Sequence, residues 1–111
     1  NKSILKMASG ILGQSAPSAT TDTTVYTVPA STLAVLSVSV TNRGAAAATV
    51  RIALSASGTP TSAEFIEFNA SVPPAGVIER TGIALQAGKN VVVHCSTADT
   101  SVSVYGLESA A

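Results

Sequence analysis

Residues 33–41 read Leu33-Ala34-Val35-Leu36-Ser37-Val38-Ser39-Val40-Thr41, a clear alternating stretch in a chain of 111 residues. Successive side chains of a β-strand point to opposite faces of the sheet. One face therefore collects Ala34, Leu36, Val38 and Val40, and the other collects Val35, Ser37, Ser39 and Thr41. This period of two predicts a half-buried strand.

Six further stretches of the same kind surround this one: 24–28, 48–55, 64–68, 77–85, 91–96 and 101–107. Turn-forming residues separate them, including Pro29, Gly58-Thr59-Pro60 and Pro73-Pro74-Ala75-Gly76. No helical period lies between them, and their spacing of roughly 11 to 14 residues is typical of antiparallel β-domains. The sequence therefore predicts an all-β fold, a single antiparallel β-sandwich or jelly-roll-like domain of about seven strands.

Two finer features are predicted within these strands. Asn42-Arg43-Gly44 has turn chemistry, so the strands at 33–41 and 48–55 are predicted to form a hairpin. In the stretch 77–85, Ile78 has the opposite parity to Ile83 and Leu85. A β-bulge at Gly82 would restore one apolar face to this strand.

Residues 1–22 differ from the rest and are predicted to form an N-terminal extended arm and linker, with residues 23–111 as the β-sandwich domain. The apolar residues of the arm stand among Ser and Gly, and we expect them to dock on a partner: Ile4, Leu5, Met7, Ile11 and Leu12. The spacing of Ile4, Met7 and Ile11 would suit a short amphipathic helix, although Gly10 and Gly13 weaken it. An extended segment that pairs with a neighbour is the equal alternative.

The composition favours a subunit of an assembly. Charged residues make up 11% of the chain, with six basic and six acidic groups that cancel, and such a bland surface is prone to associate. The alternative to an assembly subunit is a small free domain whose surface is kept soluble by Ser and Thr side chains. No basic patch or long apolar run is present, so neither nucleic acid nor a membrane is an expected partner.

Candidates for chemistry are few. His94 and Cys95 are the only His and Cys and are adjacent, so strand geometry turns them to opposite faces and no metal site is expected. Cys95 shares the parity of Val91 and Val93 and is predicted to be a small core residue. The glutamates at 64, 67, 79 and 108 are expected to be solvated rather than paired for glycoside hydrolysis. We therefore expect no enzyme and no cofactor.

A sugar-binding site would need exposed aromatic rings. The chain offers four aromatic residues, Tyr26, Phe65, Phe68 and Tyr105, and at least two are expected in the core. A single cysteine excludes an intramolecular disulfide, and no signal-peptide apolar segment is found between Lys2 and Leu12. Synthesis and folding in a reducing cytoplasm are therefore expected.

Three segments carry a resemblance to a known group of proteins. They are Thr24-Val25-Tyr26-Thr27-Val28-Pro29-Ala30, then 38–43 followed by 48–53, and Leu85-Gln86-Ala87-Gly88-Lys89-Asn90-Val91-Val92-Val93. In this order the segments resemble small virion structural proteins of tailed bacteriophages, although Lys89 stands where an acidic residue is commoner. The resemblance covers residues 9–107 and supplies no catalytic or binding residues.

The resemblance implies a non-enzymatic virion component that binds and stabilises a phage particle in many copies. It would be a capsid decoration or cement protein, or a neck or tail accessory subunit, made in the host bacterial cytoplasm and located in the virion. Its partners would be other virion proteins and further copies of itself, with a trimer as the first expectation. A receptor- or glycan-binding module of a tail fibre is the alternative.

Overall fold

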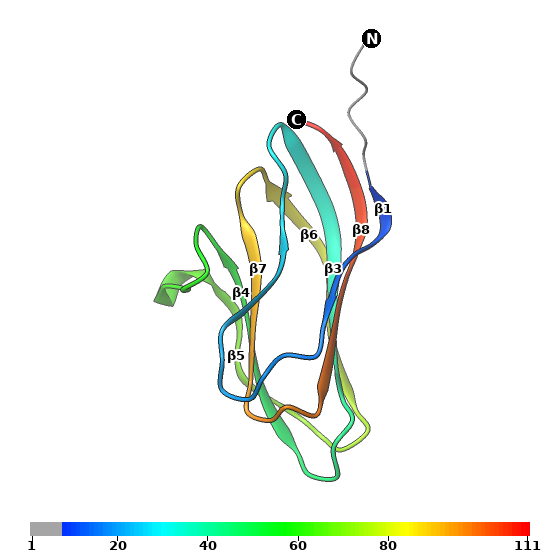
Figure 1. Ribbon diagram of the computed structural model, residues 1–111, viewed down its shortest axis with the longest axis vertical. Coiled ribbons are helices and arrows are strands. Elements are labelled where there is room, and N and C mark those ends of the chain that lie inside the picture. Colours follow the sequence, from blue (N-terminus) through cyan, green and yellow to red (C-terminus); the bar gives the residue numbers. More distant parts are fainter. Residues whose placement is uncertain (1–7) are drawn as a thin grey trace.

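The computed structural model describes residues 8–111 and is all-β apart from one short 3-10 helix (Figure 1). The strands are β1 (Ser9–Ser15), β2 (Thr23–Thr27), β3 (Thr32–Asn42), β4 (Ala48–Ser55), β5 (Phe65–Val72), β6 (Val77–Gln86), β7 (Asn90–Cys95) and β8 (Thr100–Ala110). The 3-10 helix η1 (Ser62–Glu64) lies in the connection between β4 and β5. The all-β prediction is confirmed.

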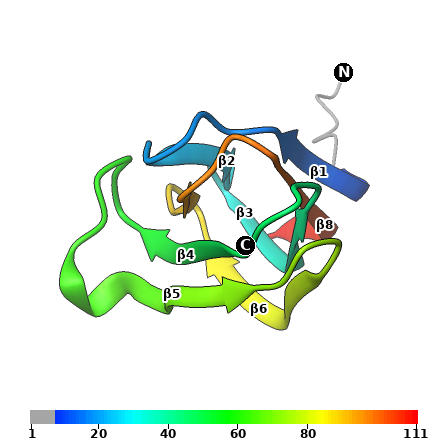
Figure 2. The same ribbon diagram turned by 90° about the horizontal axis from the view of Figure 1, so that it is seen from below.

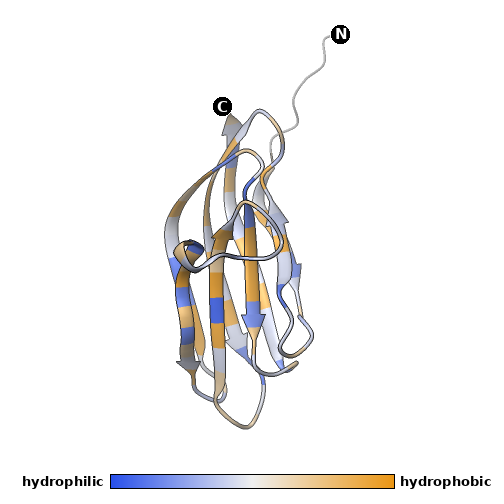
Figure 3. Ribbon diagram, turned by 90° about the vertical axis from the view of Figure 1, so that its left-hand side faces the viewer, coloured by the Kyte–Doolittle hydropathy of each residue, from blue (hydrophilic) through white to orange (hydrophobic). Residues whose placement is uncertain are grey.

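The strands form two four-stranded antiparallel sheets (Figure 2). Sheet A has the order β1-β8-β3-β6, and sheet B has the order β2-β7-β4-β5. Every connection passes from one sheet to the other except the one between β4 and β5. Hydrophobic and hydrophilic bands alternate along the strands, as the period of two requires (Figure 3).

The predicted count of seven strands is wrong by one, because residues 9–15 form an additional strand, β1. This strand pairs with β8 along sheet A, with Ser9 opposite Leu107 and Ser15 opposite Val102. Gly13 is required there, since a Cβ atom on it would lie 2.3 Å from the carbonyl oxygen of Val25 in β2. Gly13, one of the glycines that make this segment look like a loose arm, therefore allows β1 to lie close against β2.

The predicted hairpin between 33–41 and 48–55 is also wrong, because β3 belongs to sheet A and β4 to sheet B. Asn42 explains the path of the chain. Its buried side chain donates from Nδ2 to the carbonyl oxygens of Ala46 (2.8 Å) and Val72 (3.1 Å), and its Oδ1 accepts from Gly44 N (2.9 Å). These bonds hold the connection as it crosses between the sheets.

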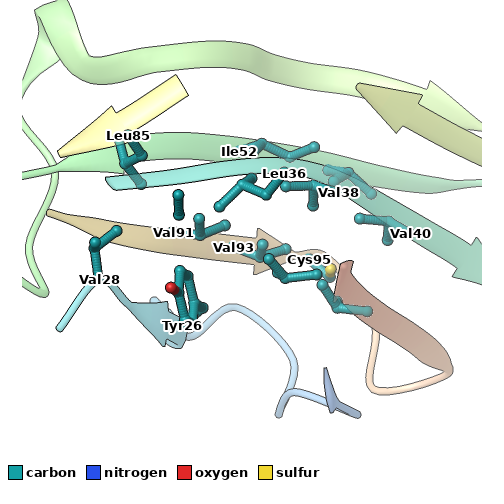
Figure 4. Close-up of a cluster of buried hydrophobic side chains, with 14 of the residues drawn as sticks. Tyr26, Val28, Leu36, Val38, Val40, Ile52, Leu85, Val91, Val93 and Cys95 are labelled. Atoms are coloured by element: carbon teal, nitrogen blue, oxygen red, sulfur yellow. The ribbon is translucent and has the colours of Figure 1, made fainter. Parts of the chain in front are cut away.

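One hydrophobic cluster takes its side chains from both sheets. Leu36, Val38 and Val40 of β3 and Val91, Val93 and Cys95 of β7 point into this cluster (Figure 4). Valine dominates, and the largest fully buried side chains are Leu36 and Ile52. The core is thus built from small branched residues with little aromatic content.

The predicted β-bulge in β6 is confirmed. The register with β3 shifts between the pairs Leu36–Ile83 and Val38–Arg80, which places Thr81 and Gly82 in the bulge. On the same strand, Arg80 reaches across to sheet B and forms a 2.6 Å ion pair with Glu67 of β5. Its Nη2 also donates to the carbonyl oxygen of Ile66 at 3.3 Å. These contacts join the β5 and β6 edges of the two sheets.

Candidate functional site

His94 and Cys95 point to opposite faces, as predicted. Cys95 is fully buried in the core cluster, and burial raises the pKa of its thiol. His94 is half-buried and lies opposite Arg51 on the outer face of sheet B. Within residues 8–111 no group of three or more His, Cys, Asp or Glu side chains is placed to hold a metal ion.

Each of the four glutamates considered as catalytic candidates has a structural partner. Glu67 pairs with Arg80, Glu79 accepts a hydrogen bond from the hydroxyl of Tyr105, and Glu108 accepts one from Tyr26. The fourth, Glu64, organises the connection between β4 and β5. None of these contacts brings two carboxylates together as glycoside hydrolysis would require.

Glu64 accepts three hydrogen bonds. Its Oε1 takes them from Thr61 N (2.9 Å) and Ser55 Oγ (2.8 Å), and its Oε2 takes one from Ala56 N (3.1 Å). The bond from Thr61 N, followed by those from Ser55 and Ala56, lowers the pKa of this carboxyl to about 2. The carboxylate thus acts as a cap that shapes residues 56–64.

Tyr26 and Glu108 form a contact that sequence reasoning missed. Tyr26 is the only aromatic residue in the core cluster, and burial, reinforced by Glu108, raises the pKa of its hydroxyl. The other oxygen of Glu108 accepts from Ala8 N at 3.0 Å, and Glu108 N donates to Ala8 O at 2.9 Å. The alternation of β8 could have indicated this contact, because Glu108 lies an even number of residues from Val102 and Val104, which face the core.

Neither a pocket nor a helix able to span a membrane is found on the described part of the chain. The surfaces of the two sheets are therefore the candidate sites. Among residues 8–111, six large hydrophobic side chains are exposed, and all but Phe68 lie at outward positions of sheet A: Ile11, Leu33, Val35, Val77 and Leu107. Such a concentration on one face is typical of an interaction surface.

Most of these side chains are neighbours at one end of sheet A. Val35 of β3 lies directly opposite Leu107 of β8, and Ile11 of β1 lies opposite Tyr105 of β8. Leu33 lies two residues before Val35 on the same face. We call the set Ile11, Leu33, Val35, Tyr105 and Leu107 the apolar patch. Leu107 and Ile11 are its most exposed members, at 62% and 59%.

The outer face of sheet A is almost free of charge. Its remaining outward positions carry mainly Ser, Thr and other small residues, including Ser37, Ser39, Ser101 and Ser103. Glu79 is the one charged side chain at the outward positions of the four strands as the structure describes them, and Tyr105 donates to it. Just beyond β3, Arg43 donates from Nε to Ser101 Oγ at 2.8 Å, at the end of this face away from the apolar patch. A partner would therefore meet an apolar surface with few charges.

The outer face of sheet B carries a different cluster. The guanidinium of Arg51 lies 4.3 Å from the ring centre of Phe68, and its Nε donates to Asn69 Oδ1 at 2.7 Å. Phe65 packs edge-on with Phe68, with ring centres 5.0 Å apart. Phe68 is 57% exposed, and Phe65 and Tyr105 are half-buried, so the core holds one aromatic residue rather than the two expected.

The predicted docking residues fall in different places. Ile11 lies in β1 and belongs to the apolar patch, whereas Leu12 packs against the core cluster. Ile11 is in an extended strand, so the helical alternative does not hold at this residue. Ile4, Leu5 and Met7 lie outside the described residues.

Comparisons with protein-family models, curated proteins and solved structures find no match to this chain. The function is therefore argued from the surfaces described above and from the resemblance noted in the sequence.

Proposed function

We propose that this chain is a non-enzymatic structural protein of a bacteriophage virion. It would be a capsid decoration or cement protein, or a neck or tail accessory subunit, that binds and stabilises the particle in many copies. The observation that carries the proposal is the outer face of sheet A, where the apolar patch lies on a nearly uncharged surface. A free monomer gains nothing from such a face, whereas an assembly subunit buries it.

We also propose that the two sheets pack as the halves of a β-sandwich of the jelly-roll type. The orders β1-β8-β3-β6 and β2-β7-β4-β5 are those of an eight-stranded jelly roll, and the shared hydrophobic cluster supports face-to-face packing. Jelly rolls occur in viral capsid proteins and also in lectins. The fold is therefore compatible with both candidate functions, and the surfaces must discriminate between them.

A modest interface per copy suffices for the proposed role. When many copies bind one particle, weak contacts add through multivalency, and the bound state is favoured by mass action. Homo-oligomers, virion partners and synthesis in the host bacterial cytoplasm are parts of this proposal.

The test is cryo-electron microscopy of the phage particle that carries this gene. Density for the domain spread over the capsid lattice would support decoration, and density at the neck or tail would support an accessory role. Absence of the domain from the particle would overturn the virion proposal. Rebinding of recombinant chain to stripped particles would then locate the surface, with Val35→Lys expected to bind more weakly than Thr49→Lys, a matched exposed position on β4.

The N-terminal docking role remains a proposal for residues 1–7, which include Ile4, Leu5 and Met7. A deletion through Gln14 would remove most of β1 and the core contact of Leu12, so it would test folding rather than docking. Deletion of residues 1–7 leaves β1 in place. Weaker particle binding by this variant, with an unchanged unfolding transition, would support the arm, and unchanged binding would remove it.

The second candidate is a receptor- or glycan-binding module of a tail fibre. The observation in its favour is the exposed ring of Phe68 beside Arg51 and Asn69, because sugar sites combine an aromatic surface with polar groups. Binding on a glycan array that is lost in Phe68→Ser would favour this candidate. A silent array together with intact particle association would count against it.

A further inference from the structure

We infer that the outer face of sheet A pairs with the same face of a second copy of this chain, so that the apolar patch becomes the centre of a two-fold symmetric interface. The inference rests on the proposal that this face is an assembly surface, and it adds the partner. In such an interface the same residues serve both subunits, so the face must be compatible with itself.

Charge is the first argument for a second copy. Two identical faces bring like charges together, and this penalty usually prevents self-pairing of charged surfaces. Here Glu79 is the single charged side chain at the described outward strand positions, and it already accepts a hydrogen bond from Tyr105. The other charge on the described part of this face is Arg43, which donates to Ser101 at the end away from the apolar patch. A different protein partner is normally selected by complementary charges, and this face provides almost none.

The shape of the face is the second argument. Next to the apolar patch, the outward positions of β3 and β8 carry small side chains such as Ser37, Ser39 and Ser103. Small residues let another sheet approach to the usual stacking distance of about 10 Å, and the larger side chains of the patch can then interdigitate. The Val35–Leu107 pair would lie near the symmetry axis and make the main apolar contact.

The size of the face is the third argument. β3 and β8 are 11 residues long, and sheet A has four strands. With a rise of about 3.3 Å per residue, a strand spacing of about 4.8 Å, and the shorter β1 (7 residues) and β6 (10 residues), the footprint is roughly 600 Å² per copy. A standard interface buries about 800 Å² per partner, so the face is large enough for a weak dimer. Weak pairing suits a subunit that is further held by a particle.

The test is sedimentation velocity of the full chain at concentrations up to about 1 mM, where contacts of this size associate. The wild type is expected to shift from monomer to dimer as concentration rises. Val35→Lys and Val35→Glu, both at an exposed position, are each expected to weaken dimerisation at least about tenfold. An equimolar mixture of the two variants is expected to restore it, because opposite charges then meet across the axis.

Thr49→Lys is the matched control, since it adds the same charge at an exposed strand position of sheet B and should leave dimerisation unchanged. Unfolding transitions of all variants confirm that the domain is folded. A wild type that stays monomeric, a trimer, or a dimer unaffected by both Val35 variants would overturn the inference. A dimer that resists both Val35 variants but disappears when residues 1–7 are removed would assign association to that segment and would also overturn it.

The same samples separate this inference from the proposed function. A chain that binds particles but never dimerises would overturn the pairing and leave the virion role in place. A chain that dimerises through Val35 but is absent from the particle would support the pairing and overturn the virion role.

Discussion

Tyr26 and Glu108 are joined by a 2.5 Å hydrogen bond from the phenol Oη to the carboxylate Oε2, although 82 positions separate them in the sequence. Tyr26 lies in β2 of sheet B and Glu108 in β8 of sheet A, so the bond links the two sheets. The second carboxylate oxygen of Glu108 accepts a hydrogen bond from Ala8 N, which directly precedes β1. A single carboxylate thus connects three segments of the domain.

Tyr26→Phe is expected to lower the free energy of unfolding by about 1 to 2 kcal/mol, because it leaves a partly buried carboxylate oxygen without its donor. The ring itself is retained, so the core packing should not change. Equilibrium unfolding in urea measures the difference. Tyr105→Phe is the matched control, since it breaks the exposed bond to Glu79 and should cost less than about 0.5 kcal/mol. Equal losses for the two variants would contradict the special role of the Tyr26–Glu108 bond.

The stability of the domain should depend on the ionisation of Glu64 in acid. Hydrogen bonds from Thr61, Ser55 and Ala56 lower the pKa of this carboxyl to about 2 in the folded chain, below its value in the unfolded chain. A lowered folded pKa gives stability that is present above the unfolded pKa and is lost as the pH falls through the folded one. The loss is therefore expected between about pH 4.5 and pH 2.

Glu64→Gln should be less stable than the wild type at neutral pH, and the difference should shrink across this acid window. Unfolding in urea at a series of pH values measures it, and an NMR titration of the Glu64 carboxyl carbon reports the pKa directly. A Glu64 pKa near the ordinary value, or a constant difference between the two proteins, would contradict this assignment.

Alternation along the chain was sufficient to predict seven of the eight strands and the bulge at Gly82, because both depend on local parity. β1 was missed because Gly10 and Gly13 interrupt its pattern, and the need for Gly13 comes from β2 rather than from its own neighbours. The turn residues after Thr41 correctly indicated a change of direction. The turn residues could not indicate that the chain crosses to the other sheet after Asn42, because the hydrogen bond that Asn42 donates to Val72 spans 30 residues.

The apolar patch could not be predicted from the alternation of single strands either. The sequence placed Val35 on the more polar side of its strand, and Leu107 also has outward parity. That they lie side by side follows from the register of β3 with β8, which is a long-range property of the fold. The predicted arm likewise mixed a patch residue, Ile11, with a core-packed residue, Leu12.

Cys95 should be unreactive in the folded protein, because it is fully buried and burial raises the pKa of its thiol. Labelling with a thiol reagent is expected to be far slower in native buffer than in denaturant, because it requires the domain to open. In denaturant the reaction should be fast. A rate in native buffer close to the rate in denaturant would point to an accessible thiol.

Gly106 marks a place where two strands of sheet A leave no room for a side chain. Its φ is +156°, and a Cβ atom on it would lie 2.1 Å from the carbonyl oxygen of Val35. Gly106→Ala is therefore expected to lower the free energy of unfolding by about 3 kcal/mol, from strain and overpacking together.

Gly10 provides the control for Gly106, because it is the cross-strand partner of Gly106 and also has a positive φ, +102°, but no atom lies within 4 Å of its would-be Cβ. Gly10→Ala should therefore report backbone strain alone, at about 1 kcal/mol. Urea unfolding of both variants gives the steric part of the Gly106 effect as the difference. Equal losses would show that contact with Val35 is not what limits this position, and that the β3–β8 pair has room to adjust beneath the apolar patch.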